Sequence, residues 1–372
     1  MLRNLEIDRL RAIAVLMTIF SHFNGITRGE VSWYGIITQY IQGNDGVILF
    51  FSISGYVISL TLIPKINSCL SYAHYKRTLL SFWIKRLTRI TPMAILWIAI
   101  PFLCTIFLNK SGIWGVFYYN LRGAIAAAFN VFNIFNVFDS GKSIYGVYWS
   151  LSLEEQFYIV FPFFLFLFKT YNQRIISLII AMLLFDLVPN SIRPGFRFEA
   201  IAFGVILYLI INRYSVFRDF KVNKLFGIPL ATLLIMLILI FPPYVSGLFP
   251  ASIYEPLDSL VPMLLVWLAT MQKGLILPIK SLEPVLDWIG TRSYGLYLIH
   301  LPAFYLSFTI LYQTQHNNVL CRSFLALIIG VTLAELCYRY FETPIRNYGR
   351  NLSFTISQQG TTHDIFLGET AI

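Results

Sequence analysis

The sequence predicts an all-α, polytopic integral membrane protein, and three features lead to this fold class. First, 57% of its 372 residues are hydrophobic and 12% are charged, about half the charged fraction of soluble domains. Second, apolar runs near the ~20 residues that a helix needs to cross a bilayer recur along the chain. Third, Lys and Arg gather in short loops between these runs, as on the cytoplasmic side of membrane proteins. The net charge of +10 therefore indicates membrane orientation and not nucleic-acid binding.

The apolar runs predict about ten membrane-spanning helices. They cover residues 10–27, 46–64, 90–108, 148–168, 174–190, 198–212, 225–241, 256–272, 289–312 and 319–340. The stretch 113–138 is also apolar, but Arg122, Gly123 and several Asn interrupt it, and one more crossing would invert every later loop. We therefore expect a re-entrant or interfacial segment there, where irregular backbone needs protein or water beside it.

The loop charges predict that both termini are cytoplasmic. The stretch 65–89 is strongly basic and has no acid; its cations are Lys65, Lys76, Arg77, Lys85, Arg86 and Arg89. Further basic turns mark the same side, with Lys169, Arg174, Arg213, Arg218, Lys221, Lys224, Lys273, Lys280 and Arg292. The intervening loops, which carry Arg28 and Asp186, are neutral or acidic and are expected on the opposite side. Residues 348–372 are expected to form a short polar cytoplasmic tail.

Two expected absences follow from the same sequence. The first apolar run is long and carries Arg11 and His22, which argues against a cleavable signal peptide. The four cysteines, at 69, 104, 321 and 337, show no spacing typical of a disulfide framework or a zinc site. We therefore expect no metal.

An arginine and a histidine share one predicted face of the first apolar run. Arg11 and His22 are eleven helical steps apart, which brings them within ~20° of each other and separates them by ~16 Å along the axis. Ionisable residues in hydrocarbon are costly and are read as functional by default, and imidazole can accept a proton from a hydroxyl. Asp8 lies on the same face. The structural alternatives are that Arg11 only reaches the membrane interface and that His22 only caps the helix.

Two further patterns carry charge into apolar segments. Arg86 and Arg89 are three residues apart and share a helix face, and guanidinium groups suit phosphate; the alternative is an ordinary positive flank. Glu154 and Glu155 fall about two turns into a span, where two acids are hard to explain structurally. Such a carboxylate could orient His22 or accept a hydrogen bond from a substrate hydroxyl.

Smaller polar patterns surround these residues. Ser150 lies four residues before Glu154 on one face, and Trp149 and Tyr158 could stack on a sugar or anchor at the interface. The small residues of 49–58 favour close helix packing over a catalytic role. His300, two residues before Pro302, is more readily explained as a hydrogen-bonded structural histidine than as a second base.

In this order, the patterns resemble the membrane-bound acyltransferase-3 family. The matching segments are Arg11 with His22, FFSISGY at 50–56, RLTR at 86–89, WSLSLEEQFY at 149–158, SYGLYLIHLP at 293–302 and ETPIR at 342–346. Each motif is short, but their order on successive spans is specific and covers about residues 5–347. One departure is Ile48, which stands where many members have an acid or amide; the nearest acid is Asp45.

The resemblance implies a transmembrane acyltransferase domain over residues 1–347 in the cell inner (cytoplasmic) membrane, without the hydrolase-like domain that some members append. It implies transfer of an acyl group, most often acetyl, from cytoplasmic acyl-coenzyme A. The expected acceptor is a sugar hydroxyl of a cell-surface polysaccharide, such as lipopolysaccharide O-antigen or its lipid-linked precursor. Acetyl-CoA is therefore the expected co-substrate, and a glycan or lipid-linked glycan and membrane lipid are the expected partners.

Roles for individual residues follow as expectations. Arg11, Arg86 and Arg89 would bind the donor phosphates, and His22 and Glu154 would be catalytic. The residues expected to contact substrate are Trp149, Ser150, Glu155, Tyr158 and His300. An acyl-histidine intermediate and direct transfer both remain open. The alternative function is a transporter or flippase that uses the same polar interior for a glycan or lipid.

Overall fold

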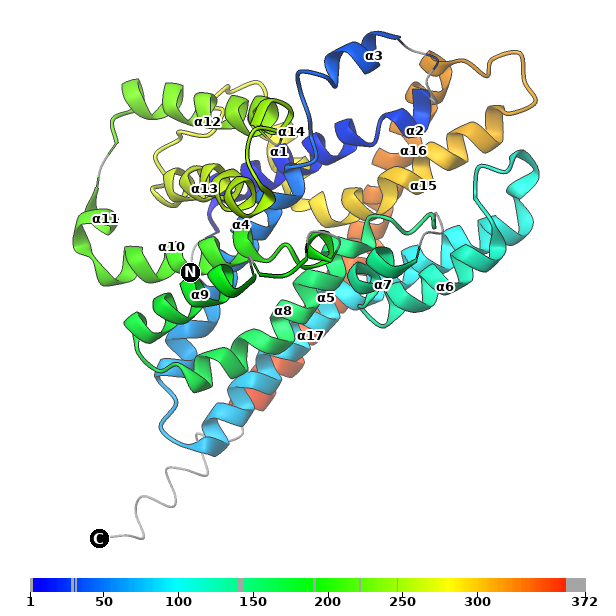
Figure 1. Ribbon diagram of the computed structural model, residues 1–372. Coiled ribbons are helices and arrows are strands. Elements are labelled where there is room, and N and C mark those ends of the chain that lie inside the picture. Colours follow the sequence, from blue (N-terminus) through cyan, green and yellow to red (C-terminus); the bar gives the residue numbers. More distant parts are fainter. Residues whose placement is uncertain are drawn as a thin grey trace, which may run out of the picture.

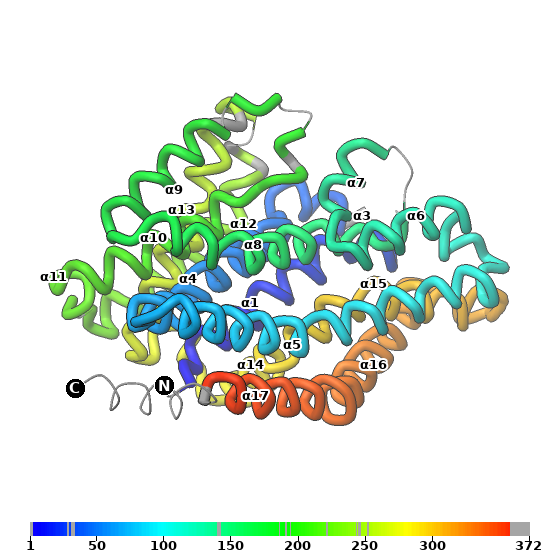
Figure 2. The backbone as a smooth tube through the Cα atoms, turned by 90° about the horizontal axis from the view of Figure 1, so that it is seen from below, coloured from blue at the N-terminus to red at the C-terminus, as the bar shows by residue number. Residues whose placement is uncertain are grey.

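The computed structural model is a bundle of helices, and the part of the chain that it describes contains no strand (Figures 1 and 2). It describes residues 3–27, 30, 32–139, 143–185, 187–189, 192–220, 222–245 and 247–358. The α-helices are α1 Leu5–Ser21, α2 Asn24–Thr27, α3 Ser32–Ile37, α4 Gly46–Asn67, α5 Tyr72–Phe107, α6 Phe117–Ala128, α7 Phe132–Phe138, α8 Tyr148–Leu167, α9 Tyr171–Phe185, α10 Glu199–Arg213, α11 Ser215–Asp219, α12 Lys224–Val245, α13 Ala251–Thr270, α14 Glu283–Thr291, α15 Ser293–Leu311, α16 Val319–Cys337 and α17 Thr343–Gln358. Short 3-10 helices η1 and η2 cover Asn109–Ser111 and Arg193–Phe196, and a π-helical turn, η3, covers Tyr338–Glu342.

Eight helical stretches among the described residues are long and apolar enough to cross a membrane. They include α1 with α2, α4, α5, α8, α12, most of α13, α14 with α15, and α16 through α17. The helices α9 and α10 lie at the two other predicted spans, but each has only 15 residues. The all-α, polytopic membrane fold is therefore confirmed, whereas the exact number of spans stays a prediction.

The stretch 113–138 folds into two short helices, α6 and α7. They are joined by a turn at Asn130, whose φ of 55° is left-handed. With 12 residues, α6 is about 18 Å long, too short to cross a hydrocarbon core of about 30 Å. Neither helix can span the membrane alone, as expected for an interfacial or re-entrant segment.

Close helix packing at the centre explains the small residues of 49–58. The helix α4 is the most buried of the candidate spans and packs against α1, α10 and α13. A Cβ atom on Gly55 would lie 2.1 Å from the carbonyl oxygen of Ile201 in α10, and one on Gly204 would lie 2.2 Å from that of Ser52. Glycine at both positions lets the two backbones approach.

The structure corrects the predicted loop at 65–89. Residues 72–89 form the first half of α5, a helix of 36 residues that is about 54 Å long. Ser71 caps the helix by accepting a hydrogen bond from the His74 N–H at 3.1 Å. From Tyr72 up to Pro92 the helix contains no Gly or Pro. Because this length exceeds the hydrocarbon core, part of α5 must extend beyond the membrane.

The last predicted spans also have different boundaries. The predicted span 289–312 is divided between α14 and α15, which meet at Arg292. The predicted tail begins inside α17, which runs beside α5 in both views (Figures 1 and 2). Arg28, Asp186, Lys221 and the tail residues 359–372 lie outside the described residues.

The outer helices expose large apolar side chains, as a lipid-facing surface requires. Examples are Leu233 of α12, and Leu327 and Ile328 of α16. The stretch from Val319 to Ser357 is the least buried of the candidate spans. This periphery surrounds the more buried α1, α4 and α15, which carry the polar residues described next.

Candidate functional site

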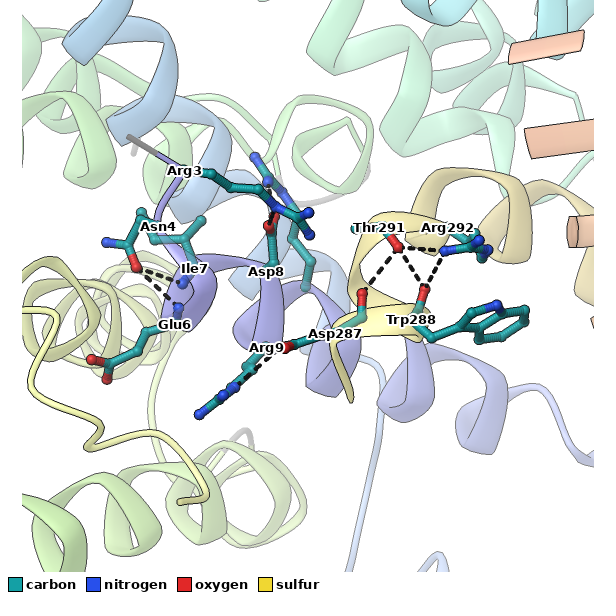
Figure 3. A network of polar contacts seen from close by, with 11 residues as sticks. Arg3, Asn4, Glu6, Ile7, Asp8, Arg9, Asp287, Trp288, Thr291 and Arg292 are labelled. Carbon is teal, nitrogen blue, oxygen red and sulfur yellow. Dashed lines mark hydrogen bonds and ion pairs between the residues drawn. The ribbon is translucent and has the colours of Figure 1, made fainter. Parts of the chain in front are cut away.

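The first turns of α1 form an ion-pair network with α14 (Figure 3). The Asp8 carboxylate accepts from Arg3 Nε at 2.5 Å and from Arg11 Nη1 at 2.7 Å. The Arg9 guanidinium lies 3.2 Å from both Asp287 and Glu283. The aspartate predicted to share a face with Arg11 therefore fixes that guanidinium directly.

Arg11, Arg86 and Arg89 converge on one cavity of about 90 Å³. Its walls come from α1, α4, α5, α8 and α15. The polar lining residues are Arg11, Ser54, Arg86, Arg89, Ser150, Glu154, Tyr158, Ser293, Tyr294 and Tyr297. We call it the arginine cavity. Three arginines and one glutamate give the lining a net positive charge, which favours an anion.

Two of these arginines form no ion pair with a described residue. Arg11 pairs with Asp8, but within the described part of the chain neither Arg86 nor Arg89 forms an ion pair. The Arg86 guanidinium instead lies over the rings of Phe82 and Tyr158, at 5.7 and 5.6 Å from their centroids. Its Nε is buried and has no hydrogen-bond partner among the described residues. Such groups are suited to binding phosphate oxygens.

Glu154 faces the arginine cavity and is held by two hydroxyl groups. Its Oε1 accepts hydrogen bonds from Ser54 of α4 and from Tyr158 of α8. No contact joins Glu154 to His22 among the described residues, so the structure does not bring the two expected catalytic residues together. The expected orienting role of Glu154 toward His22 has no support in this arrangement.

His22 lies instead beside His300. It follows the last residue of α1, and its Nδ1 is 2.9 Å from the Thr18 carbonyl oxygen. The ring centroids of His22 and His300 are 5.2 Å apart, and His300 Nδ1 is 2.7 Å from the Tyr297 carbonyl oxygen. A carbonyl can only accept, so each Nδ1 carries the proton and each Nε2 is left as an acceptor. His300 Nε2 is buried and has no partner in the described part of the chain.

Tyr297 connects this histidine pair to the arginine cavity. Its side chain lines the cavity, its hydroxyl lies 2.6 Å from Ser150 Oγ, and its ring centroid is 5.9 Å from that of His300. Tyr297 and His300 are three residues apart on α15 and therefore lie on neighbouring positions of one face. Tyr297 and His300 both belong to the motif at 293–302. The fold then brings His22, which is distant in sequence, next to His300.

A second, polar hollow is lined in part by Ser21, the residue directly before His22. It has a volume of about 300 Å³ and is lined by Phe20, Ser21, Asn24, Tyr34, Thr38, Gln42, Gly43 and Asn44. Ser21 Oγ lies 3.3 Å from His22 Nδ1. The Tyr34 hydroxyl donates to the Phe20 carbonyl at 2.8 Å, and burial raises the pKa of this hydroxyl. We call this hollow the outer pocket.

The remaining predicted site residues have different surroundings. Ser150 and Tyr158 line the arginine cavity, whereas Trp149, Glu155 and His300 do not. Trp149 packs edge-on against Phe51, with ring centroids 5.8 Å apart. Glu155 is buried, and its Oε1 has no hydrogen-bond partner among the described residues.

Asp45 belongs to a separate buried cluster. It lies with Asp258 close to Arg197, whose Nη2 is 3.3 Å from Asp258 Oδ2. Ile48 is buried in the hydrophobic core. Neither residue lines the arginine cavity. Among the described residues, no group of three or more His, Cys, Asp or Glu side chains could hold a metal ion.

Sequence reasoning missed the functional placement of Ser54 and Tyr297. Ser54 was expected only to ease helix packing, yet it donates to Glu154. Tyr297 lies inside the motif at 293–302 but was not singled out. Its spacing of three residues from His300 is the signal that could have identified it.

Comparison with known proteins identifies the family of the chain. A family model described as an acyltransferase domain matches residues 4–339. The chain is 30% identical to the peptidoglycan O-acetyltransferase OatA of Listeria monocytogenes over 373 residues, which cover 92% of this chain and 56% of that protein. It is 28% identical to the O-acetyltransferase OatA of Staphylococcus aureus over 372 residues, which cover 92% and 57%.

The chain therefore spans little more than half the length of these curated relatives. No solved structure matches it. The family match covers most of the chain and includes all the residues that line the arginine cavity and the outer pocket. This chain belongs to the acyltransferase-3 family.

Proposed function

We propose that this protein transfers an acetyl group from cytoplasmic acetyl-CoA across the membrane to a sugar hydroxyl of a cell-surface polysaccharide. The observation that carries the proposal is the position of the His22–His300 pair. His300 lies beside Tyr297 of the arginine cavity, and His22 lies beside Ser21 of the outer pocket. A donor in the arginine cavity and an acceptor in the outer pocket could thus both reach the same pair.

We assign the donor to the arginine cavity because the net positive charge of its lining suits the donor phosphates. Arg86 and Arg89 lack an ion pair within the described residues, and basic residues at this end of α5 favour the cytoplasmic side. Phosphate groups would offset these charges, and the acyl-pantetheine arm would extend toward Tyr297. The ~16 Å rise from Arg11 to His22 is of the order of that arm.

The acceptor is assigned to the outer pocket because its lining suits a sugar. Asn24, Thr38, Gln42 and Asn44 offer donors and acceptors, and the rings of Phe20 and Tyr34 also line it. Lipopolysaccharide O-antigen, or its lipid-linked precursor, is the acceptor expected from the sequence. The name of the Listeria relative makes peptidoglycan the alternative acceptor to test.

In the proposed reaction, His22 acts as the base. Its Nε2 removes the proton from the acceptor hydroxyl, whose oxygen then bonds to the acyl carbon as the carbon–sulfur bond breaks. The proton passes from His22 to the departing thiolate, so coenzyme A leaves as the thiol. His300 keeps its unprotonated Nε2 near the imidazolium that forms and would share its charge. An acyl-histidine route would instead leave labelled acetyl on the protein.

Purified protein supplied with acetyl-CoA and a glycan tests the proposal. The expected result is release of coenzyme A that depends on the glycan, with one acetyl mass added to it. The His22→Ala variant should release none, whereas His316→Ala, at an exposed histidine, should match the wild type. Full activity in His22→Ala would remove the base from the proposal. Glycan translocation without coenzyme A release would instead support the transporter alternative.

The acceptor is identified separately in cells. Mass spectrometry of O-antigen and of peptidoglycan, with and without the protein, should show loss of an acetyl mass from one of the two. An unchanged acetyl content of both would exclude these acceptors.

A further inference from the structure

Cationic side chains from three helices lie near Arg86, one of the arginines that line the arginine cavity. Lys65 lies in the last turn of α4, Lys85 precedes Arg86 on α5, and Arg350 lies on α17. Lys85 lies within electrostatic reach of Lys65, Arg86 and Arg350. Its strongest charged neighbours are thus all cations. We call Lys65, Lys85 and Arg350 the outer cation group.

The packing of α17 on α5 fixes the position of Arg350. Ser81 Oγ of α5 lies 2.6 Å from Ser353 Oγ of α17 in a buried contact. Two turns further along α5, a Cβ atom on Gly349 would lie 1.9 Å from Thr88 Oγ1. The helices therefore run antiparallel (Figure 2), and this register puts Arg350 level with Lys85. The convergence is a result of helix packing and not of side-chain flexibility alone.

Like charges held this close repel one another, and a bound anion would offset the repulsion. Lysine and arginine together are a common phosphate-binding set. None of these three residues lines the arginine cavity itself, but Lys85 directly precedes Arg86, which does. A donor whose diphosphate binds Arg86 would therefore bring its nucleotide end toward the outer cation group.

We propose that Lys65, Lys85 and Arg350 bind the 3′-phosphate of the donor nucleotide, while Arg86 and Arg89 bind its diphosphate. This inference rests on the proposed function, because it takes acyl-coenzyme A as the donor. It adds a binding role for α17, whose Arg350 lies far from the family motifs at 86–89 in sequence. A phosphate of an anionic lipid headgroup has the same chemistry and is the competing source.

Binding of coenzyme A and of 3′-dephospho-coenzyme A to the full-length protein separates these sources. Calorimetry in nanodiscs of neutral lipid should give the wild type about tenfold preference for coenzyme A, the effect of one charge-assisted hydrogen bond. Lys85→Gln and Arg350→Gln should reduce this preference to near one. Lys76→Gln, at an exposed lysine on the same helix, should leave it unchanged.

Three results would overturn this inference. The wild type could bind both nucleotides equally, or the variants could weaken both by the same factor. The variants could also lose anionic-lipid binding in matched nanodiscs while keeping the nucleotide preference, which would assign the group to lipid. If the protein prefers coenzyme A over its 3′-dephospho form but transfers no acetyl group, the proposed function alone is contradicted. Transfer without that preference would contradict this inference alone. Thermal unfolding of each variant checks that it folds.

Discussion

Replacing Arg89 by glutamine separates a donor-binding role from a structural one. Arg89 lines the arginine cavity with Arg11 and Arg86, and it forms no ion pair among the described residues. Its removal therefore breaks no ion pair. It relieves repulsion by the two cations Arg11 and Arg86 and gives up an attraction to the one anion Glu342. We expect the stability of Arg89→Gln to equal or exceed that of the wild type, while donor binding weakens.

The size of the binding loss follows from the bonds that a phosphate would make. A hydrogen bond to a charged group contributes about 1.5–3 kcal/mol, and about 1.4 kcal/mol corresponds to a factor of ten. The KM for acetyl-CoA should rise about 10- to 100-fold, with a smaller change in kcat. The assay is coenzyme A release at varied acetyl-CoA and saturating glycan, together with thermal unfolding in the same detergent.

A buried arginine outside the cavity provides the matched control. Arg9 is paired with both Asp287 and Glu283 at 3.2 Å, so Arg9→Gln leaves those acids without their partner. It should lower the free energy of unfolding by about 1–3 kcal/mol, because both acids are partly exposed, and leave the KM unchanged. An Arg89→Gln protein that loses stability but keeps its KM would refute the donor-binding role.

The remaining predictions concern packing and the cavity wall. Gly55→Leu should destabilise the fold by about 1–3 kcal/mol, because its Cβ would lie 2.1 Å from the Ile201 carbonyl oxygen. Gly330→Ala, inside α16 and with its nearest atom at 3.9 Å, should not lower the unfolding midpoint. Tyr297→Phe should slow transfer about tenfold or more, and an unchanged rate would remove its hydroxyl from the proposal. Glu154→Gln removes the one acid that lines the cavity, so donor affinity should hold or rise while the rate falls; weaker donor binding would contradict this reasoning.

The fold class and the arginine cavity follow from local sequence patterns. The three-residue spacing of Arg86 and Arg89 requires only a helix to put both on one face, and α5 provides it. Charge rules also placed Arg11 at the same end of the bundle. These predictions succeed because spacing on one helix and charge near a membrane are local properties.

The histidine pair could not be predicted in the same way. His22 and His300 are 278 positions apart in sequence, and their contact depends on how α1 packs against α15. The acidic pattern at 154 and 155 suggested Glu154 as the partner of His22. The packing of α4 on α8 instead lets Ser54 donate a hydrogen bond to Glu154. The length of α5 was also missed, because the positive charges that mark a loop also suit a helix that projects beyond the membrane.

Transfer across a sealed membrane tests the central claim most directly. Proteoliposomes would hold the glycan acceptor inside, with labelled acetyl-CoA added only outside, and with the protein inserted so that the basic end of α5 faces outward. The account predicts labelled acetyl on the enclosed glycan for the wild type and none for His22→Ala. It would be contradicted if the glycan were labelled only when donor and acceptor share one side of the membrane.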